Sequence, residues 1–247
     1  MLFITNMLNK LTVIFFLVLL VSCTHDDGYR IEGNKVVYEN PWNTGFGTTI
    51  TNLDADAKTF QVLGDNKLDW AKDKDKVFWG TKELDYMDPA SFEIFTTSMA
   101  KDKDKVICGR DIMKEANPRE FKIRTFLDKN GDESIYGVDK HGAFICSEYP
   151  DGYFYLPSNS INSFQQLEDY FFKDHENVWW GNRVLPDVNV STFKVISGGY
   201  ATDGNNIYYH KKVVQGADVE TFDVIGSRYA QDKNYRYEME DRVGRVQ

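Results

Sequence analysis

The stretch YATDGNNIYYH (Tyr200–His210), followed by GADVETFDVI (Gly216–Ile225), determines the predicted fold of this 247-residue chain. In the first stretch, short runs of β-branched and aromatic residues flank a polar turn that Asp203 opens. In the second, Phe222 and Val224 fall on one face, because side chains alternate with a period of two along a strand. Both stretches therefore predict short strands joined by tight turns.

This pattern recurs along the chain with a period of 29 residues. In a regular unit an Asp opens the turn, a second landmark follows after six residues, a Phe after thirteen more and the next Asp after another ten. The Asp residues are Asp73, Asp102, Asp174, Asp203 and Asp232, and the second landmarks are Trp79, Cys108, Trp180 and Tyr209. The Phe residues are Phe92, Phe121, Phe193 and Phe222. DKHGAFICS from Asp139 fits a further unit with one extra residue in its turn, so we count six units and a partial seventh.

The predicted fold class is all-β, an array of about six antiparallel units of three strands each. A single small unit cannot bury its aromatic face, so neighbouring units must stack on one another. A propeller blade of four strands needs about 40–45 residues, which favours an open or curved stack, with a propeller-like ring as the alternative. Residues 163–170 (SFQQLEDY) carry the one helix-like pattern, and the Asp turns, with Lys at alternate positions as in residues 73–76, are expected to be solvated.

The N-terminus contains an uncharged run, LTVIFFLVLLV (Leu11–Val21), preceded by Lys10 and followed by Ser22 and Cys23. Eleven residues are too few to span a bilayer as a helix, which takes roughly 20. The run instead predicts a signal peptide over residues 1–22. LVSC resembles the lipobox of bacterial lipoproteins, which makes Cys23 the expected lipidation site, residues 23–28 a polar tether and residues 29–247 the repeat domain.

The repeat resembles the DKNYY family of bacterial proteins, through YATDGNNIYY with GADVETFDVI and through YAQDKNYRY. The resemblance implies an envelope lipoprotein and brings no catalytic residue and no cofactor. We therefore expect a bacterial cell-envelope protein that is anchored to the membrane by lipid on Cys23. Thr24 follows that Cys, so sorting to the outer membrane, on its periplasmic or surface face, is allowed.

Composition narrows the classes of function further. The net charge of −9 argues against a nucleic-acid partner, since binding phosphates needs clustered Lys and Arg. Four His and three Cys are too few for a cysteine-rich metal cluster. No nucleophile, phosphate-binding or dinucleotide motif occurs, and a repeated set of polar residues is unsuited to forming one unique catalytic constellation. We therefore expect no enzyme.

One loop offers candidate ligands for a calcium ion. DKNGDESIYGVD places Asp128, Asn130, Asp132, Ser134 and Asp139 at positions 1, 3, 5, 7 and 12 of a calcium loop, and its opening resembles an EF-hand loop. Glu133 stands where the sharp turn asks for Gly, and no helix pattern flanks the loop. The alternative interpretation is a hairpin turn enlarged by two residues.

Cys108 and Cys146 fall at the same predicted position in consecutive units, which makes them candidates for a disulfide in an oxidising compartment. The alternative is two small residues that fill an aromatic layer.

Aromatic residues are the candidates for a ligand surface: Tyr153, Tyr155, Trp179 and Tyr208. Adjacent rings in a strand point to opposite faces, so one face of the array could expose a ladder of rings. The alternative is that stacking buries both faces.

The predicted function is a non-catalytic lipoprotein whose repeat surface contacts an envelope protein. Binding of carbohydrate by exposed rings is the alternative, and a hydrolase in the long insertion comes third.

Overall fold

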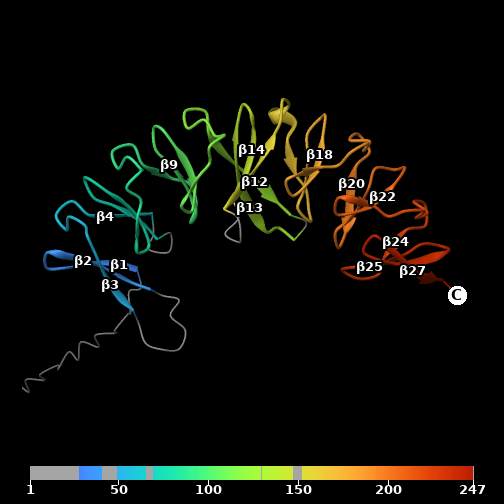
Figure 1. The fold of residues 1–247 in the computed structure, drawn as a ribbon, viewed down its shortest axis with the longest axis horizontal. Coiled ribbons are helices and arrows are strands. Elements are labelled where there is room, and N and C mark those ends of the chain that lie inside the picture. Colours follow the sequence, from blue (N-terminus) through green and yellow to red (C-terminus); the bar gives the residue numbers. More distant parts are fainter. Residues whose placement is uncertain (1–27, 41–48, 65–68, 129, 147–151, 247) are drawn as a thin grey trace, which may run out of the picture.

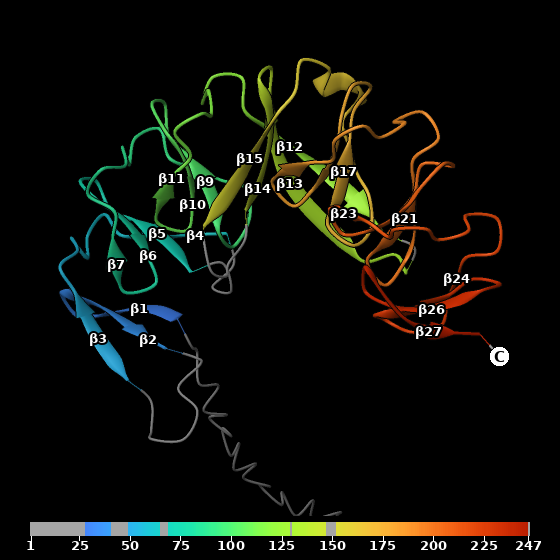
Figure 2. The same cartoon turned by 45° about the vertical axis from the view of Figure 1, so that its right-hand side comes forward.

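The computed structural model describes residues 28–40, 49–64, 69–128, 130–146 and 152–246. These residues form seven antiparallel sheets that follow one another along an open arch (Figure 1). Rotating the arch shows the sheets stacked face to face, with the first and last described sheets at its two ends (Figure 2). The predicted all-β class and open curved stack are therefore confirmed, and the propeller-like ring is wrong.

Each sheet is a meander in which consecutive strands are neighbours. Sheet 1 contains β1 (Gly28–Glu32), β2 (Lys35–Glu39) and β3 (Ile50–Leu53). Sheet 2 contains β4 (Gln61–Leu63), β5 (Trp70–Lys72), β6 (Val77–Trp79) and β7 (Lys82–Glu83). Sheet 3 contains β8 (Glu93–Ile94), β9 (Met99–Lys101), β10 (Val106–Cys108) and β11 (Asp111–Ile112). Sheet 4 contains β12 (Lys122–Leu127), β13 (Glu133–Asp139), β14 (Gly142–Cys146) and β15 (Tyr153–Pro157).

The remaining three sheets follow the same order. Sheet 5 contains β16 (Gln165–Gln166), β17 (Phe171–Lys173), β18 (Val178–Trp180) and β19 (Arg183–Val184). Sheet 6 contains β20 (Lys194–Ser197), β21 (Tyr200–Thr202), β22 (Ile207–Tyr209) and β23 (Lys212–Val213). Sheet 7 contains β24 (Asp223–Val224), β25 (Tyr229–Gln231), β26 (Tyr235–Glu238) and β27 (Asp241–Arg245).

Two predictions about the unit are wrong. Six of the sheets have four strands rather than three. Four strands fit into the short period because most of them are only two or three residues long, as in sheet 2. The helix expected over residues 163–170 is absent, since a 3₁₀ turn (Ile161–Ser163) is followed at once by β16.

Stacking buries both faces of the two central strands in each inner sheet. In sheet 2, Trp70 and Val77 pack toward sheet 3, against residues that include Ala100. Their neighbours Ala71 and Phe78 pack toward sheet 1, against Tyr29 and Tyr38. Alternate residues of one hairpin therefore pack into two different cores, one on each side of the sheet. This is the predicted alternative in which stacking buries both faces.

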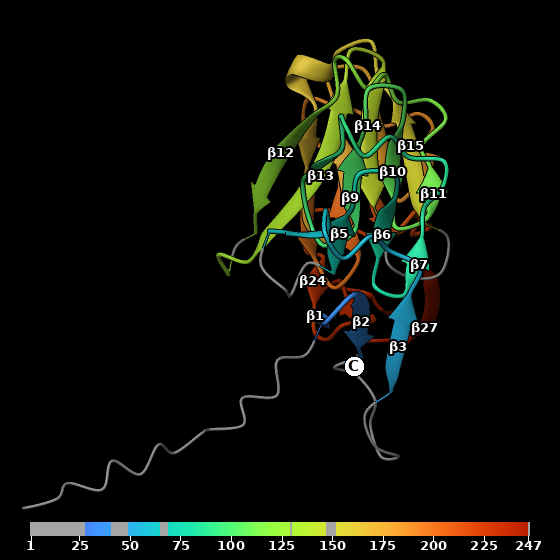
Figure 3. The same cartoon turned by 90° about the vertical axis from the view of Figure 1, so that its left-hand side faces the viewer.

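The outer strands form the two margins of the array. Figure 3 shows β12 along one margin and β11 and β15 along the other. The first strands of the sheets therefore share one margin, and the fourth strands share the opposite one.

Candidate functional site

The recurring Asp residues are buried. They are the most regular polar feature of the chain, and the sequence pattern predicted that they would be solvated. In the structure each is only 2% to 5% exposed: Asp73, Asp102, Asp139, Asp174, Asp203 and Asp232. The prediction of solvated turns is therefore wrong for the Asp that opens each turn.

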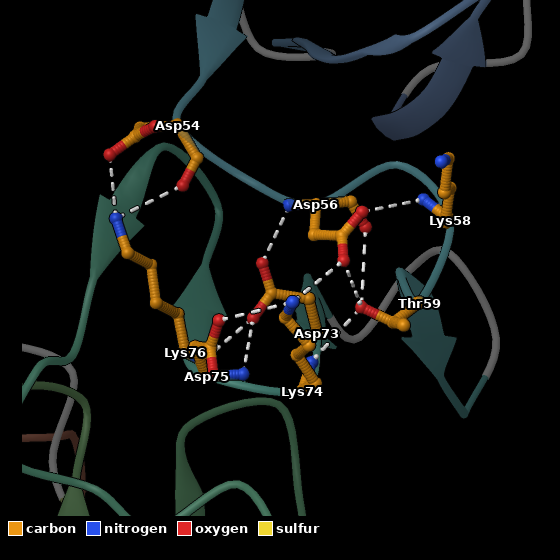
Figure 4. Close-up of polar contacts among 8 residues, drawn as sticks. All are labelled: Asp54, Asp56, Lys58, Thr59, Asp73, Lys74, Asp75 and Lys76. Atoms are coloured by element: carbon orange, nitrogen blue, oxygen red, sulfur yellow. Dashed lines mark hydrogen bonds and ion pairs between the residues drawn. The ribbon is translucent and has the colours of Figure 1, made fainter.

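Asp73 shows how such a carboxylate is accommodated (Figure 4). Its Oδ1 accepts the backbone N–H of Asp75 at 2.8 Å and of Lys76 at 2.7 Å, which closes the turn between β5 and β6. Its Oδ2 accepts the backbone N–H of Asp56, which belongs to the loop from sheet 1, at 2.8 Å. Asp favours this local arrangement because its short side chain reaches backbone N–H groups two and three residues ahead. One carboxylate thus fastens the turn to the incoming loop.

A hydroxyl on the incoming loop completes the joint. Thr59 accepts the backbone N–H of Lys74 at 3.2 Å and also lies 3.2 Å from the Asp56 carboxylate (Figure 4). The Lys74 ammonium group lies 3.4 Å from that same carboxylate. Lys74 therefore pairs with the carboxylate of Asp56 in the loop. The buried carboxylate of Asp73 instead accepts hydrogen bonds from backbone N–H groups.

The same joint recurs along the array. The Oδ2 atom accepts a backbone N–H of the incoming loop in four further sheets: Asp88 to Asp102 at 2.8 Å, Asn117 to Asp139 at 2.8 Å, Asn189 to Asp203 at 3.1 Å and Asp218 to Asp232 at 2.9 Å. In sheet 5 the Ser158 hydroxyl donates to Asp174 at 2.6 Å instead. We call these contacts the Asp joints. They fix the spacing between neighbouring sheets.

Two Asp joints also hold a buried tyrosine. The hydroxyl of Tyr208 donates to Asp203 at 2.9 Å, and that of Tyr237 donates to Asp232 at 2.7 Å. Burial raises the pKa of both carboxyls, but the surrounding N–H and O–H donors outweigh it, so that each pKa lies below its ordinary value. Burial, with the adjacent carboxylate, raises the pKa of Tyr208 and Tyr237 to about 12. The carboxylates are thus acceptors in a structural network, and the tyrosines remain neutral donors.

Of the calcium ligands predicted from the loop, Asp128, Asn130, Asp132 and Ser134 line one surface pocket, but Asp139 does not join them. Asp139 lies at the far end of β13 from Glu133, roughly 20 Å away for a strand of that length. Oδ1 of Asp128 accepts the backbone N–H of Asn130 and of Asp132, both at 2.8 Å. The described residues contain no cluster of three or more acidic, His or Cys side chains suited to a metal. Asp139 therefore does not complete the predicted ligand set, and the segment forms an enlarged hairpin turn between β12 and β13.

The four aromatic residues predicted to form a ligand surface differ in burial. Trp179 is 1% exposed and Tyr208 is 2% exposed, so neither belongs to a surface ladder. Tyr153 and Tyr155 are partly buried against the core between sheets 3 and 4, where Tyr155 stacks on Phe144 with 5.0 Å between ring centroids. The hydroxyl of Tyr155 donates to the His141 carbonyl.

Tyr153 lines a groove of about 510 Å³ together with Tyr86, which sequence reasoning missed. The other residues of this groove are Arg110, Asp111, Ile112, Lys114 and Glu115. The Tyr153 hydroxyl donates to Glu115 at 2.7 Å and accepts the backbone N–H of Lys114 at 3.0 Å. The sequence did not indicate Tyr86, because this residue lies in the loop just before Asp88 and not at one of the paired aromatic positions of the repeat.

Cys108 and Cys146 form a disulfide that joins sheet 3 to sheet 4, with Cα atoms 5.6 Å apart. Their repeat positions are nevertheless different. Asp139 pairs with Gly142 across its turn, just as the N–H of Asp73 bonds to the Lys76 carbonyl. The turn has no extra residue, so that Ile145 rather than Cys146 stands six residues after its Asp.

The position after the aromatic landmark receives a side chain from the preceding sheet. A Cβ at Gly80 would lie 3.7 Å from the Tyr38 ring, and one at Gly109 would lie 3.3 Å from the Trp79 ring. At the joint between sheets 5 and 6, Trp180 stacks on His210 with centroids 4.2 Å apart. Cys146 occupies this receiving position, and Cys108 occupies the ring position before it. The disulfide therefore replaces a contact between a ring and the residue that receives it.

The predicted lipidation site, Cys23, lies outside the described residues. Across the ranges that the structure describes, no helix has the length and apolar character needed to span a membrane.

Taken together, the stacked meanders and the Asp joints define a repeat protein of the open β-array class. The sequence profile of the DKNYY family matches residues 7–106 and 70–241, and the chain belongs to that family. Searches of curated proteins and of solved structures gave no match.

Proposed function

We propose that this protein is a non-catalytic, lipid-anchored protein of the bacterial cell envelope, and that its repeat surface binds another envelope protein. The observation that carries the proposal is the use of the recurring carboxylates. Each one accepts hydrogen bonds within an Asp joint, so the most regular polar groups of the chain serve the scaffold. What remains for function is the outer surface.

The groove between Tyr86 and Tyr153 supports a protein partner. It combines two tyrosines with Arg110 and with acidic and basic neighbours. Tyrosine and arginine are enriched at protein interfaces, where a ring provides contact area and a guanidinium pairs with carboxylates. The carbohydrate alternative loses support, because the rings proposed for it at Trp179 and Tyr208 are buried.

The lipid anchor rests on the sequence of the N-terminus. The family match begins at residue 7, and it therefore includes the apolar run and Cys23. Several acyl chains on one Cys would hold the protein stably at a membrane, whereas one chain binds only marginally. The polar tether after Cys23 would place the array next to that membrane, with the outer membrane as the proposed location.

The anchor is tested with Cys23→Ala in the full chain. The variant should no longer be found in the membrane fraction, and it should no longer be labelled by a radioactive or tagged fatty acid supplied to the cells. Ser22→Ala, which keeps the thiol, is the matched control. Unchanged fractionation and labelling of Cys23→Ala would remove the anchor from the proposal.

The interaction is tested by crosslinking the full chain in native envelopes and identifying the captured proteins. Arg110→Glu, in the groove, should remove a specific partner. Arg119→Glu makes the same charge change in another groove, beside Lys101 and Asp102, and should retain it. Equal capture by both variants would place the interface elsewhere than in the groove, and the absence of any specific partner would contradict the proposed function.

A further inference from the structure

The first strand of sheet 4, β12, differs from the other strands of its margin. It has six residues, whereas β4 has three, β8, β16 and β24 have two, and β20 has four with a shift in register. β1 comes nearest in length with five residues, and it carries a charged pair, Arg30 with Glu32. Proteins protect sheet edges by keeping edge strands short or irregular, because an open edge can pair with another chain. β12 is long and regular, and it lies on the outside of the array (Figure 3).

The hydrogen-bonding groups of β12 alternate between its partner β13 and the open side. The N–H of Asp128 donates to the Asp132 carbonyl at 3.0 Å and closes the hairpin, so the next pair, Leu127 with Glu133, is of the non-bonded kind. By the same alternation Ile123, Thr125 and Leu127 direct their backbone N–H and C=O groups away from β13.

The side chains of these three residues share one face of the strand. Ile123 is 39% exposed and Leu127 is 63% exposed. The short strand β8 of sheet 3 does not extend over them. Among the residues that the structure describes, the open edge of β12 thus combines backbone groups that have no partner strand with an apolar strip.

We propose that β12 pairs antiparallel with β12 of a second copy of this chain, about a twofold axis at Thr125. An antiparallel pair requires that residues with outward backbone groups stand opposite each other. With the axis at Thr125, Ile123 stands opposite Leu127 of the second copy, and the outward groups of all three residues are used. A shift of the axis to Ile123 or Leu127 leaves at least one of these residues without its counterpart.

This register is self-complementary in charge. Lys122, whose side chain is exposed, stands opposite Asp128 of the second copy, and symmetry makes this pair twice. Arg124 stands opposite Phe126, so this pair brings no second charge to the contact, and its guanidinium stays bonded to the Ile161 carbonyl of its own chain at 2.8 Å. No like charges face each other, and opposite charges across strands stabilise the pairing. This complementarity selects a second copy over an unrelated extended segment, and it is the isologous contact common in homodimers.

The pairing is independent of the lipid anchor and of the groove between Tyr86 and Tyr153. Each of the three proposals can therefore fail while the others stand.

A disulfide test fixes both the partner and the register. In the full chain with Cys23→Ser, studied in detergent, Thr125→Cys should give a covalent dimer under mild oxidation. Opposite residues of a bonded pair have Cα atoms about 5.5 Å apart, which suits a disulfide. Ile123→Cys alone should remain monomeric on a non-reducing gel, whereas a mixture of Ile123→Cys and Leu127→Cys chains should crosslink. Absence of the Thr125→Cys dimer, or equal crosslinking by Ile123→Cys alone, would overturn the proposal.

A second measurement uses the mass of the full chain in detergent by analytical ultracentrifugation. Thr125→Pro removes an outward N–H without breaking a bond to β13, so the fold should persist while the dimer is lost. Thr125→Val keeps that N–H and should dimerise like the native chain. Lys122→Glu should weaken the dimer about tenfold, since it turns two attractive pairs into repulsive ones. A monomeric native chain, or a Thr125→Pro variant that stays dimeric with native circular dichroism, would refute the pairing.

Discussion

Substitution of Asp102 tests whether the Asp joints hold the array together. Its Oδ1 accepts the backbone N–H groups of Asp104 at 2.8 Å and Lys105 at 2.6 Å, and its Oδ2 accepts that of Asp88 at 2.8 Å. The side chain of Asp104, in the same turn, is 62% exposed. The two residues therefore provide a matched pair, with one buried and one exposed carboxylate in a single turn.

The expected losses follow from the donors left without an acceptor. Asp102→Asn keeps one oxygen for the turn but turns an amide NH₂ toward the N–H of Asp88, which should cost about 2 kcal/mol. Asp102→Ala leaves all three N–H groups buried without their acceptor, which should cost about 4 kcal/mol. Asp104→Asn should change the free energy of unfolding by less than about 0.5 kcal/mol.

Urea unfolding followed by tryptophan fluorescence is the suitable assay. Trp70 packs on Phe92 of the same joint, with 5.5 Å between ring centroids, so the signal reports the region that the substitution weakens. For a slope of about 2 kcal/mol per molar urea, Asp102→Asn should lower the midpoint by about 1 M. If Asp102→Asn and Asp104→Asn had the same midpoint, the buried carboxylate would not be a structural joint, and the argument from it would fail.

Three further outcomes are expected from the same geometry. Replacing Cys108 and Cys146 by Ser should lower the free energy of unfolding by up to about 4 kcal/mol, since 38 residues separate them; equal urea midpoints with and without reductant would contradict this. Gly109→Ala should cost about 2 kcal/mol, because a Cβ there meets the Trp79 ring of the preceding sheet at 3.3 Å and φ is +58°. Gly33→Ala, with φ of +66° and no contact within 4 Å, should cost about 1 kcal/mol, and equal losses for the two variants would mean that backbone strain alone is responsible. The pKa of Asp232 is lowered in the folded state, so its stabilisation is complete above the unfolded pKa and is lost as the pH falls through the folded value. Asp232→Asn should therefore flatten the loss of stability that urea titrations show as the pH falls below about 4, the ordinary pKa of Asp.

The repeat made most of the fold predictable. The period of 29 residues fixed the order of the units, and the alternation around residues such as Phe222 indicated strands. These signals are local, because a period of two is visible in a few consecutive residues. The fourth strands were missed for the same reason. A two-residue strand such as Lys82–Glu83 is exposed and carries no alternation, and it forms because β6 offers an edge to pair with.

The burial of Asp73 depends on a contact that its own segment does not contain. The sequence DKDK has the composition of a solvated turn, and Lys74 and Asp75 are indeed exposed, while Lys76 is half-buried. The backbone N–H of Asp56 selects the first Asp for burial, and it arrives from another sheet. The repeat position of Cys146 was also not predictable from its own segment. A difference of one residue decides whether Cys146 stands at the position of a ring or at the next position, which contacts a ring from the preceding sheet. Only the pairing of Asp139 with Gly142 settles that count.

The last described sheet differs from the others on its outward face. In sheet 6 the face toward sheet 7 carries Ile207 and Tyr209, which are 1% and 7% exposed. The corresponding positions of sheet 7, four and six residues after its Asp, are Arg236 and Glu238. A repeat array needs a polar outer face on its terminal unit to remain in solution. Arg236 and Glu238 therefore make this face more polar than the equivalent face of sheet 6, although both occur within an otherwise regular unit.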